Sequence, residues 1–203
     1  TFILSTKENS YKISRWQERG LVRKVTANLY TSNMHDDLDA FIQRRLFELV
    51  GLVYPGAIIA DRSAFEMLST VSNELFIISD KNKVSTFGKY TVYPRKGAAP
   101  QPDDFPFMQN LYQPSIARKF LENAKTTRRY ASRSPRYLSK KELEERLEDY
   151  LRTHREEGFN RLRDQMRTLA PTLGLEKEFF IINDIMGAML GTREAQLSSE
   201  VAQ

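Results

Sequence analysis

Apolar residues along the chain alternate between the spacing of helices and the two-residue period of strands. The clearest helical period lies in DDLDAFIQRRLFELVGLVYPG, residues 36–56, where acids precede the apolar positions and a Pro-Gly pair follows them. This segment predicts a single helix. Its apolar face consists of Leu38, Phe41, Ile42, Leu46, Leu49 and Val50.

The first thirty residues predict a helix followed by a two-stranded ribbon. Ile13 and Trp16 stand at helical spacing, and Gly20 can supply the left-handed cap of a helix that ends near Arg19. Apolar and polar residues then alternate over 21–31, with an Ala-Asn pair in the middle that can form the bend. A helix followed directly by such a ribbon is typical of a winged helix.

The middle of the chain predicts a small mixed sheet with short helices. Strands are expected at 74–80 and 89–97, and a brief apolar strand precedes a helix that Asp61 and Ser63 can cap. The segment 98–114 carries four prolines and no sustained period, which predicts an ordered loop over the core. A further short helix is expected at 115–125.

The final third of the chain predicts long helices. Ser139 and Glu142 have the spacing of a capping box, and an apolar stripe runs through the charged helix that follows. Gly158 marks an expected bend or interruption, Pro171 lies near the expected end, and a last helix is expected to end at Gly191.

The predicted fold class is therefore α+β. We expect a winged helix with a small mixed sheet over residues 1–124, a basic linker over 125–141, and a helical segment over 142–203. The linker holds seven basic residues and no acid, which favours a solvated connector. A second contact for polyanions, with Tyr130 and Tyr137 stacking on bases, is the alternative.

Composition narrows the classes of protein. The 203 residues and the 40% hydrophobic content predict a soluble globular protein, and no apolar run is long enough for a membrane span or a signal peptide. Cysteine is absent, and two histidines, His35 and His154, predict no metal site. We expect a cytoplasmic protein whose sequence continues upstream of Thr1.

Positive charge is concentrated around the first predicted helix. Between residues 7 and 24 there are six cations and two acids, and such cations supply contacts to DNA phosphates. In a winged helix the N-terminal end of the recognition helix lies deepest in the groove. The predicted DNA-binding residues are Tyr11, Lys12, Ser14, Arg15, Arg19, Arg23 and Lys24. The alternative interpretation is an ordinary solvated surface.

Motifs for catalysis are missing from the sequence. It contains no glycine-rich phosphate loop, no serine nucleophile elbow, and no histidine pair beside a carboxylate cluster. Asp61, Arg62 and Ser63 are interpreted as a helix cap and an ion pair at the head of a helix. No catalytic residue is predicted.

Three stretches carry a resemblance to a known family. RWQERGLVRKVTANLYTSN, PGAIIADRSAFE and NRLRDQMRTLAPTLGL…GAMLGTREAQLSSEVAQ resemble the N-terminal region of bacterial Fic-family proteins, the cell filamentation proteins, over nearly the whole chain. The first part is also similar to the winged-helix segment of AbiEi-type transcriptional regulators and antitoxins. The matching residues are Gly20, Val22, Arg23, Tyr30, Ser63 and Ala64.

This resemblance implies a regulatory role next to a catalytic part that this sequence does not contain. The family signature His-Pro-Phe-x-(Asp or Glu)-Gly-Asn-Gly-Arg does not occur here, so no catalytic residue is carried over. The full-length parent is expected to transfer AMP from ATP to a protein hydroxyl, and ATP and Mg²⁺ are implied only for the absent part.

For this segment the resemblance implies regulation or recognition. Together with the cations around the first helix, it leads us to expect binding of double-stranded DNA, in transcriptional autoregulation or toxin–antitoxin-like control. The alternative is a protein-interaction or autoinhibitory module that recruits targets to the transferase domain or restrains it. The expected partners are DNA and the C-terminal Fic domain of the same parent chain, with a homodimer as a further option and no membrane.

A short motif bears on the alternative of an autoinhibitory module. Many Fic proteins are inhibited by a helix with the pattern (Ser/Thr)-x-x-x-Glu-(Gly/Asn), whose glutamate pairs with an active-site arginine. THREEG matches it through Thr153, Glu157 and Gly158. The alternative interpretation is that Glu157 is one of many carboxylates on a charged helix.

Overall fold

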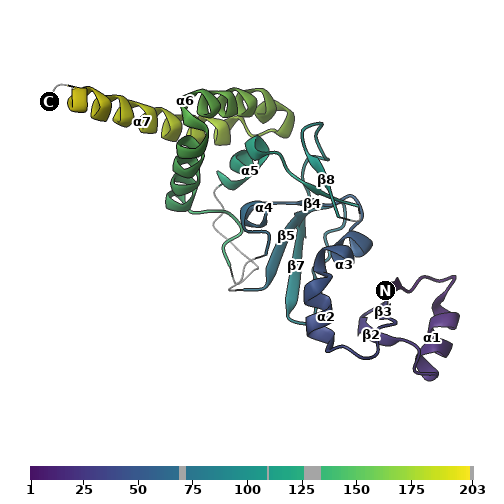
Figure 1. Cartoon of the computed structure of the whole chain (residues 1–203). Helices are drawn as coiled ribbons and strands as arrows, with labels where there is room; N and C mark the ends of the chain where they lie inside the picture. Colours follow the sequence, from purple (N-terminus) through teal and green to yellow (C-terminus); the bar gives the residue numbers. More distant parts are fainter. Residues whose placement is uncertain (69–71, 109, 126–133, 202–203) are drawn as a thin grey trace.

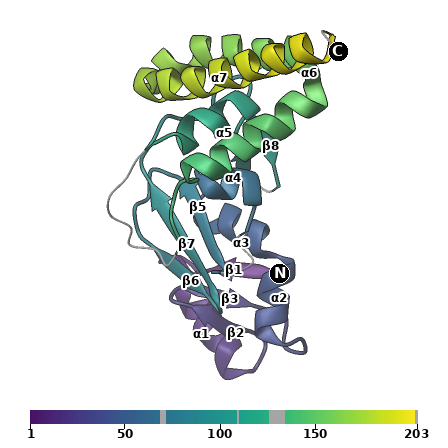
Figure 2. The same cartoon turned by 90° about the vertical axis from the view of Figure 1, so that its left-hand side faces the viewer.

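The protein is an α+β structure with two sheets and a separate layer of helices (Figure 1). The computed structural model describes residues 1–68, 72–108, 110–125 and 134–201, with side chains as far as Gly191. An N-terminal unit of strands and one helix lies at one end, a six-stranded sheet in the middle, and the long C-terminal helices at the other end (Figures 1 and 2). The predicted fold class is confirmed at this level.

The N-terminal unit contains the predicted helix and ribbon. Its three-stranded antiparallel sheet has the order β1-β3-β2, so a first strand that the sequence did not predict pairs with β3. Gly20 follows the helix with a φ of 68°, and Asn28 forms the ribbon's bend with a φ of 59°. The elements are β1 (Phe2–Leu4), α1 (Ser10–Glu18), β2 (Arg23–Thr26) and β3 (Leu29–Thr31).

The segment 36–54 forms two helices, so the prediction of a single helix was wrong. Arg45, with φ −124° and ψ 23°, separates α2 (Leu38–Arg44) from α3 (Leu46–Val53). Its guanidinium pairs with Glu48 at 2.6 Å and lies over the ring of Phe41. These contacts hold the break in place, and the apolar spacing continues across it, so the pattern alone looked uninterrupted.

The second sheet is mixed, as predicted, with the strand order β6-β7-β5-β4-β9-β8. β5 runs parallel to β7 and β4 runs parallel to β9, and the other pairings are antiparallel. Its strands are β4 (Ile58–Ile59), β5 (Glu74–Ile78), β6 (Ser85–Phe87), β7 (Tyr90–Arg95), β8 (Phe105–Phe107) and β9 (Leu111–Gln113).

The segment 98–114 was predicted to be a loop, but it contains the hairpin of β8 and β9. The proline-rich composition concealed these strands. Pro106 lies in β8, the edge strand of the sheet, where a residue without an N–H is tolerated. The position of the sheet edge could not be predicted from the sequence, because strand order depends on long-range pairing.

The described residues form two large hydrophobic cores and one small cluster around Ile58 and Ile78. The first includes the sheet residues Leu75, Ile77 and Val92 together with side chains of α2 and α3. The second is built by three helices, with Phe120 and Leu147 among its buried side chains. The remaining helices are α4 (Arg62–Glu66), α5 (Ile116–Asn123), α6 (Lys140–Leu173) and α7 (Glu176–Val201). Because α5 belongs to the second core, the helical layer begins before residue 142.

The long helix α6 begins as predicted but does not bend where expected. Both hydrogen bonds of the capping box are present, because Ser139 accepts from the Glu142 N–H and Glu142 accepts from the Ser139 N–H. The kink lies at Arg155, with φ 57°, three residues before Gly158. Gly174 provides the left-handed cap.

The last helix does not end at Gly191 as predicted. α7 continues to Val201, because a single glycine weakens a helix without ending it. Within the described parts of the chain, none of the helices combines the length and the apolar character that crossing a bilayer requires.

A buried ion network connects the sheet to the helices. Asp61 is fully buried, and the guanidinium of Arg95 binds its carboxylate at 2.6 Å while that of Arg136 binds it at 2.9 Å. Arg95 also reaches Glu122 on α5 at 3.2 Å. From Glu122 the network continues through Arg118, which is 0% exposed, to Asp104.

Asp61 and Ser63 do not cap α4 as the sequence suggested. The side chain of Asp61 makes no capping hydrogen bond, and the Ser63 hydroxyl accepts from the N–H of Phe76 in β5. Asp61 and Arg62 do not pair with each other either, because Asp61 binds Arg95 of β7 and Arg136 before α6, while Arg62 binds Glu66 and Glu142. Asp61 has a φ of 55°, outside the usual range for a residue with a side chain.

The described end of the expected linker 125–141 is partly packed instead of fully solvated, because Tyr137 and Leu138 are buried while Pro135 and residues 139–141 are exposed. Arg62 donates to the carbonyl oxygens of Pro135 and Tyr137 and binds Glu142 with two hydrogen bonds of 2.7 and 2.9 Å. Tyr137 is 9% exposed and so does not form a stacking platform. Tyr130, the other residue of that alternative, lies outside the described residues.

Charge and burial have opposing effects within these contacts. Burial of Arg95 disfavours its charged form, but Asp61 and Glu122 more than offset this, so the pKa of Arg95 is raised. Burial raises the pKa of Glu122, and Arg95 and Arg118 counter only part of that effect. The guanidinium of Arg62 lowers the pKa of Glu142 to about 2.

Replacement of Asp61 tests how much the network contributes to stability. Asp61→Asn leaves Arg95 and Arg136 without their shared buried counter-charge, so we expect the free energy of unfolding to fall by about 3 kcal/mol or more. Chemical denaturation measures this loss. Asp149→Asn, which removes an exposed pair with Arg152, is the control and should cost less than about 1 kcal/mol. Equal losses in the two variants would contradict a stabilising role for the network.

The Arg62–Glu142 pair predicts a pH dependence of stability. The folded pKa of Glu142 is depressed, so its contribution is present above the unfolded pKa near 4.5 and is lost as the pH falls toward 2. The Glu142 side chain is 37% exposed, so solvent screening reduces the expected effect of Glu142→Gln at pH 7 to about 1 kcal/mol. Denaturation at several pH values should show this difference shrinking between pH 4.5 and 2.

Candidate nucleic-acid interface

The predicted DNA-binding cations on α1 share one exposed face. At 3.6 residues per turn, Lys12, Arg15 and Arg19 fall within an arc of about 60° around the helix axis. All three are exposed, and Ile13, on the opposite side, is 2% exposed. The helix therefore buries its apolar side and presents its cations to solvent.

The other predicted residues of α1 also lie at the surface. Ser14 is exposed, and Tyr11, near the N-terminal end of the helix, is 75% exposed. The guanidinium of Arg15 lies 5.9 Å from the centre of the Tyr11 ring, and the Lys12 ammonium lies 4.7 Å from that of Trp16. These contacts orient the two cations without neutralising them.

Of the two cations on the ribbon, Lys24 has no ion-pair partner among the residues that the structure describes, and Arg23 is already bound. Lys24 on β2 is exposed and lies opposite Tyr30 of β3. Arg23 has an internal role, because its Nη2 donates to the backbone oxygen of Asp36 at 2.5 Å. This bond connects β2 to the loop before α2. From the sequence, Arg23 was predicted to bind DNA with the other cations. Its contact with Asp36, thirteen residues away, could not be recognised from the neighbouring residues.

Nearly all of the net charge of the protein lies in this unit. Residues 1–31 hold six basic and two acidic side chains, an excess of four in a chain whose net charge is +5. The remaining residues are close to neutral as a group. The helix α1 also lies far from α6 and α7, at the opposite end of the molecule in both views (Figures 1 and 2). The long helices therefore lie away from the basic face, whose cations Lys12, Arg15 and Arg19 are exposed.

The residues of the predicted inhibitory motif lie on α6 around its kink. Glu157 is exposed and pairs with Arg161, and the Thr153 hydroxyl donates to the Asp149 carbonyl. Gly158 is buried, and a Cβ there would lie 2.6 Å from the Cβ of His154. Close packing at the kink accounts for this glycine without inhibition, and the inhibitory role stays a prediction.

Sequence reasoning missed the ion network around Asp61. The sequence shows an acid and an arginine, Asp61 and Arg62, directly after the apolar run of residues 57–60. It does not show which distant arginines bind Asp61. Arg118 and Glu122 have the spacing of an ordinary surface pair on a helix, and only the packing of α5 against the sheet shows that they are buried. Among the described residues, no group of three or more acidic or histidine side chains is arranged to hold a metal ion.

Comparison with known proteins does not extend these observations. The chain matches no family model, no curated protein and no solved structure. The resemblance to Fic-family and AbiEi-type proteins therefore stays a prediction, and the candidate interface depends on the geometry of α1 and its ribbon.

Two glycines on the long helices test whether Gly158 has a structural role. Gly158→Ala forces the new methyl group against His154, so we expect destabilisation of about 1–3 kcal/mol. At Gly187 an added Cβ meets nothing within 4 Å, so Gly187→Ala should stabilise by about 0.5–1 kcal/mol through helix propensity. Thermal unfolding followed by circular dichroism measures both changes. A stable Gly158→Ala variant would leave the motif without a structural explanation.

Proposed function

We propose that the chain is a DNA-binding regulatory region, with α1 and the ribbon of β2 and β3 forming its contact with the duplex. The observation that carries this proposal is the exposed face formed by Lys12, Arg15 and Arg19, with Lys24 on the adjacent ribbon. Such cations replace counterions condensed on the DNA backbone, which gives salt-dependent affinity.

The dimensions and order of the elements support this use. An α-helix with its side chains is about 10–12 Å across and fits a major groove about 12 Å wide. A strand, a helix and a hairpin follow one another, with β1 paired to β3, as in the second half of a winged helix. Residues 1–31 contain one helix, α1, whereas a winged helix has further helices before its recognition helix. The assignment as a winged helix is therefore part of the proposal.

The residues of the interface divide into two roles. Lys12, Arg15, Arg19 and Lys24 contact phosphates and supply most of the affinity, without sequence preference. Tyr11 and Ser14 lie toward the N-terminal end of α1, where a recognition helix approaches base edges, and they contribute any sequence discrimination. Arg23 acts indirectly, by fixing the ribbon to the loop at Asp36.

The biological setting that we propose follows the Fic resemblance. A parent protein would carry a nucleotidyltransferase part beyond this region, and DNA binding would serve control of its own gene or toxin–antitoxin-like control. The position of α1 at the far end from α7 is compatible with both parts acting at once (Figure 1).

Paired alanine substitutions test the DNA contact. Lys12→Ala combined with Arg15→Ala removes two exposed cations, so we expect duplex affinity to fall by about tenfold or more at low salt. The slope of log K against log salt should become shallower by about 2, because two fewer counterions are released. Fluorescence anisotropy with a short labelled duplex, titrated between about 50 and 200 mM salt, measures both quantities.

A matched variant controls for total charge. Arg161→Ala combined with Arg167→Ala removes two exposed cations from α6, far from α1, and should leave the affinity and the salt slope unchanged. Circular dichroism confirms that both double variants are folded. If the two variants weaken binding equally, the chain binds DNA through its overall charge and the proposed interface is wrong.

A further inference from the structure

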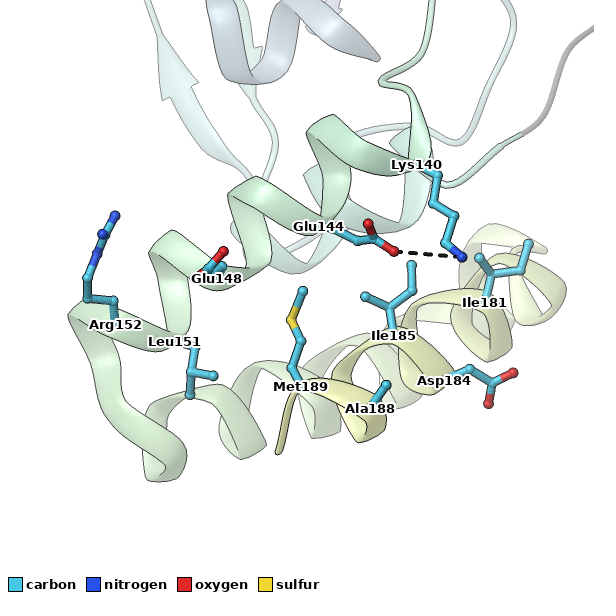
Figure 3. Close-up of a pocket in the computed structure, with 10 residues that line it drawn as sticks. All are labelled: Lys140, Glu144, Glu148, Leu151, Arg152, Ile181, Asp184, Ile185, Ala188 and Met189. Atoms are coloured by element: carbon cyan, nitrogen blue, oxygen red, sulfur yellow. Dashed lines mark ion pairs between the residues drawn. The ribbon is translucent and has the colours of Figure 1, made fainter. Parts of the chain in front are cut away.

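A groove lies between the first half of α6 and α7 (Figure 3). Its volume is about 960 Å³. Because α6 turns at Arg155, its first half diverges from α7 while the second half packs along it (Figure 3). The groove follows the stretch from Lys140 to Arg152, a length of about 18 Å at 1.5 Å per residue.

The floor of the groove is apolar and has helical spacing. Ile181, Ile185 and Met189 follow one another every four residues along α7, and Leu151 projects from α6 into the same space (Figure 3). Ile181 is 44% exposed, whereas Ile185 and Leu151 are buried deeper in the floor. Another apolar stripe with three-to-four-residue spacing would pack on this floor.

The rims of the groove carry uncompensated negative charge. The basic residues of the α6 wall are occupied on their own helix, because Lys140 lies 3.7 Å from Glu144 and Arg152 pairs with Asp149. Glu148 on α6 and Asp184 on α7 have no ion-pair partner among the described residues. A carboxylate therefore stands free on each side of the apolar floor.

We propose that this groove binds an amphipathic helix of a partner protein, with basic side chains on both flanks of its apolar stripe. The length and the apolar spacing fit a helix of three to four turns, about 12 residues. The flanking cations pair with Glu148 on one side and Asp184 on the other. Such flanking pairs select the partner in helix–helix recognition.

Other occupants fit the charges less well. In a two-fold dimer the same surface is present on both sides of the contact, so the acidic rims of one copy would face those of the other. DNA is repelled by the same carboxylates, so this groove is a separate site from the basic face of α1. The partner helix therefore comes from a different protein and carries positive charge.

Designed peptides test the proposal on the full chain. The probe is a labelled, alanine-based helical peptide of about 16 residues, with leucine at every third or fourth position and lysine on both flanks. Its matched counterpart carries glutamate in place of lysine. We expect saturable binding of the lysine peptide in fluorescence anisotropy and binding of the glutamate peptide that is about tenfold weaker or more.

Charge reversal in the protein identifies the site. Glu148→Lys combined with Asp184→Lys should weaken the lysine peptide by about tenfold and reverse the preference toward the glutamate peptide. Glu145→Lys is the matched control, because Glu145 is an exposed residue of α6 that pairs with Lys141 outside the groove. The control variant should bind the lysine peptide within about threefold of wild type.

A second measurement does not depend on how well the variants fold. In nuclear magnetic resonance of the wild-type chain, the lysine peptide should shift the methyl signals of Ile181, Ile185 and Met189 and leave those of Ile13 unchanged. Equal binding of both peptides, shifts outside the groove, or equal weakening by Glu145→Lys would overturn the proposal. So would a dimer in light scattering that Glu148→Lys dissociates, because the occupant would then be a second copy.

Discussion

The pairing of Asp61 with Arg95 and Arg136 is the interaction on which the rest of the architecture depends. It joins the end of β4, the end of β7 and the segment that leads into α6 at one buried point. Ionic groups are costly to bury, and the cost is acceptable here because every buried carboxylate of the network faces a guanidinium. Asp61 binds Arg95 and Arg136, Glu122 binds Arg95 and Arg118, and Asp104 binds Arg118. The network thus contains three acids and three arginines. A charge-balanced junction of this kind favours one orientation of the helices on the sheet.

That fixed orientation separates two surfaces of opposite character. The cations of α1 lie at one end of the molecule, and the groove with Glu148 and Asp184 on its rims lies in the helical layer at the other (Figures 1 and 3). A polyanion is attracted to the first surface and repelled by the second, while a basic helix behaves in the opposite way. The two proposed ligands would therefore occupy separate surfaces, with the six-stranded sheet between them.

Local signals in the sequence predicted the elements that local physics determines. Gly20 and the Ser139–Glu142 box marked helix ends correctly, because capping involves residues only a few positions apart. The break at Arg45 and the kink at Arg155 were missed because neither position carries a glycine or proline to mark it. The strands β8 and β9 were missed because they lie in a proline-rich segment and β9 pairs with the distant β4. The concentration of cations around α1 was visible in the sequence. The internal role of Arg23 and the burial of Arg118 did not, because a charged side chain has the same letter in solvent and in a core.

The backbone conformation and the buried charge at Asp61 place opposing requirements on the residue type at this position. Its φ of 55° and ψ of −140° fall in a region that glycine enters easily and that side-chain-bearing residues avoid. A glycine would relax the main chain and remove the carboxylate, whereas glutamate would keep the charge and require room for an extra methylene in a fully buried site. Aspartate is thus the compromise between conformational ease and electrostatic need. A substitution at this position would either remove the buried carboxylate or introduce steric strain, and both destabilise the fold.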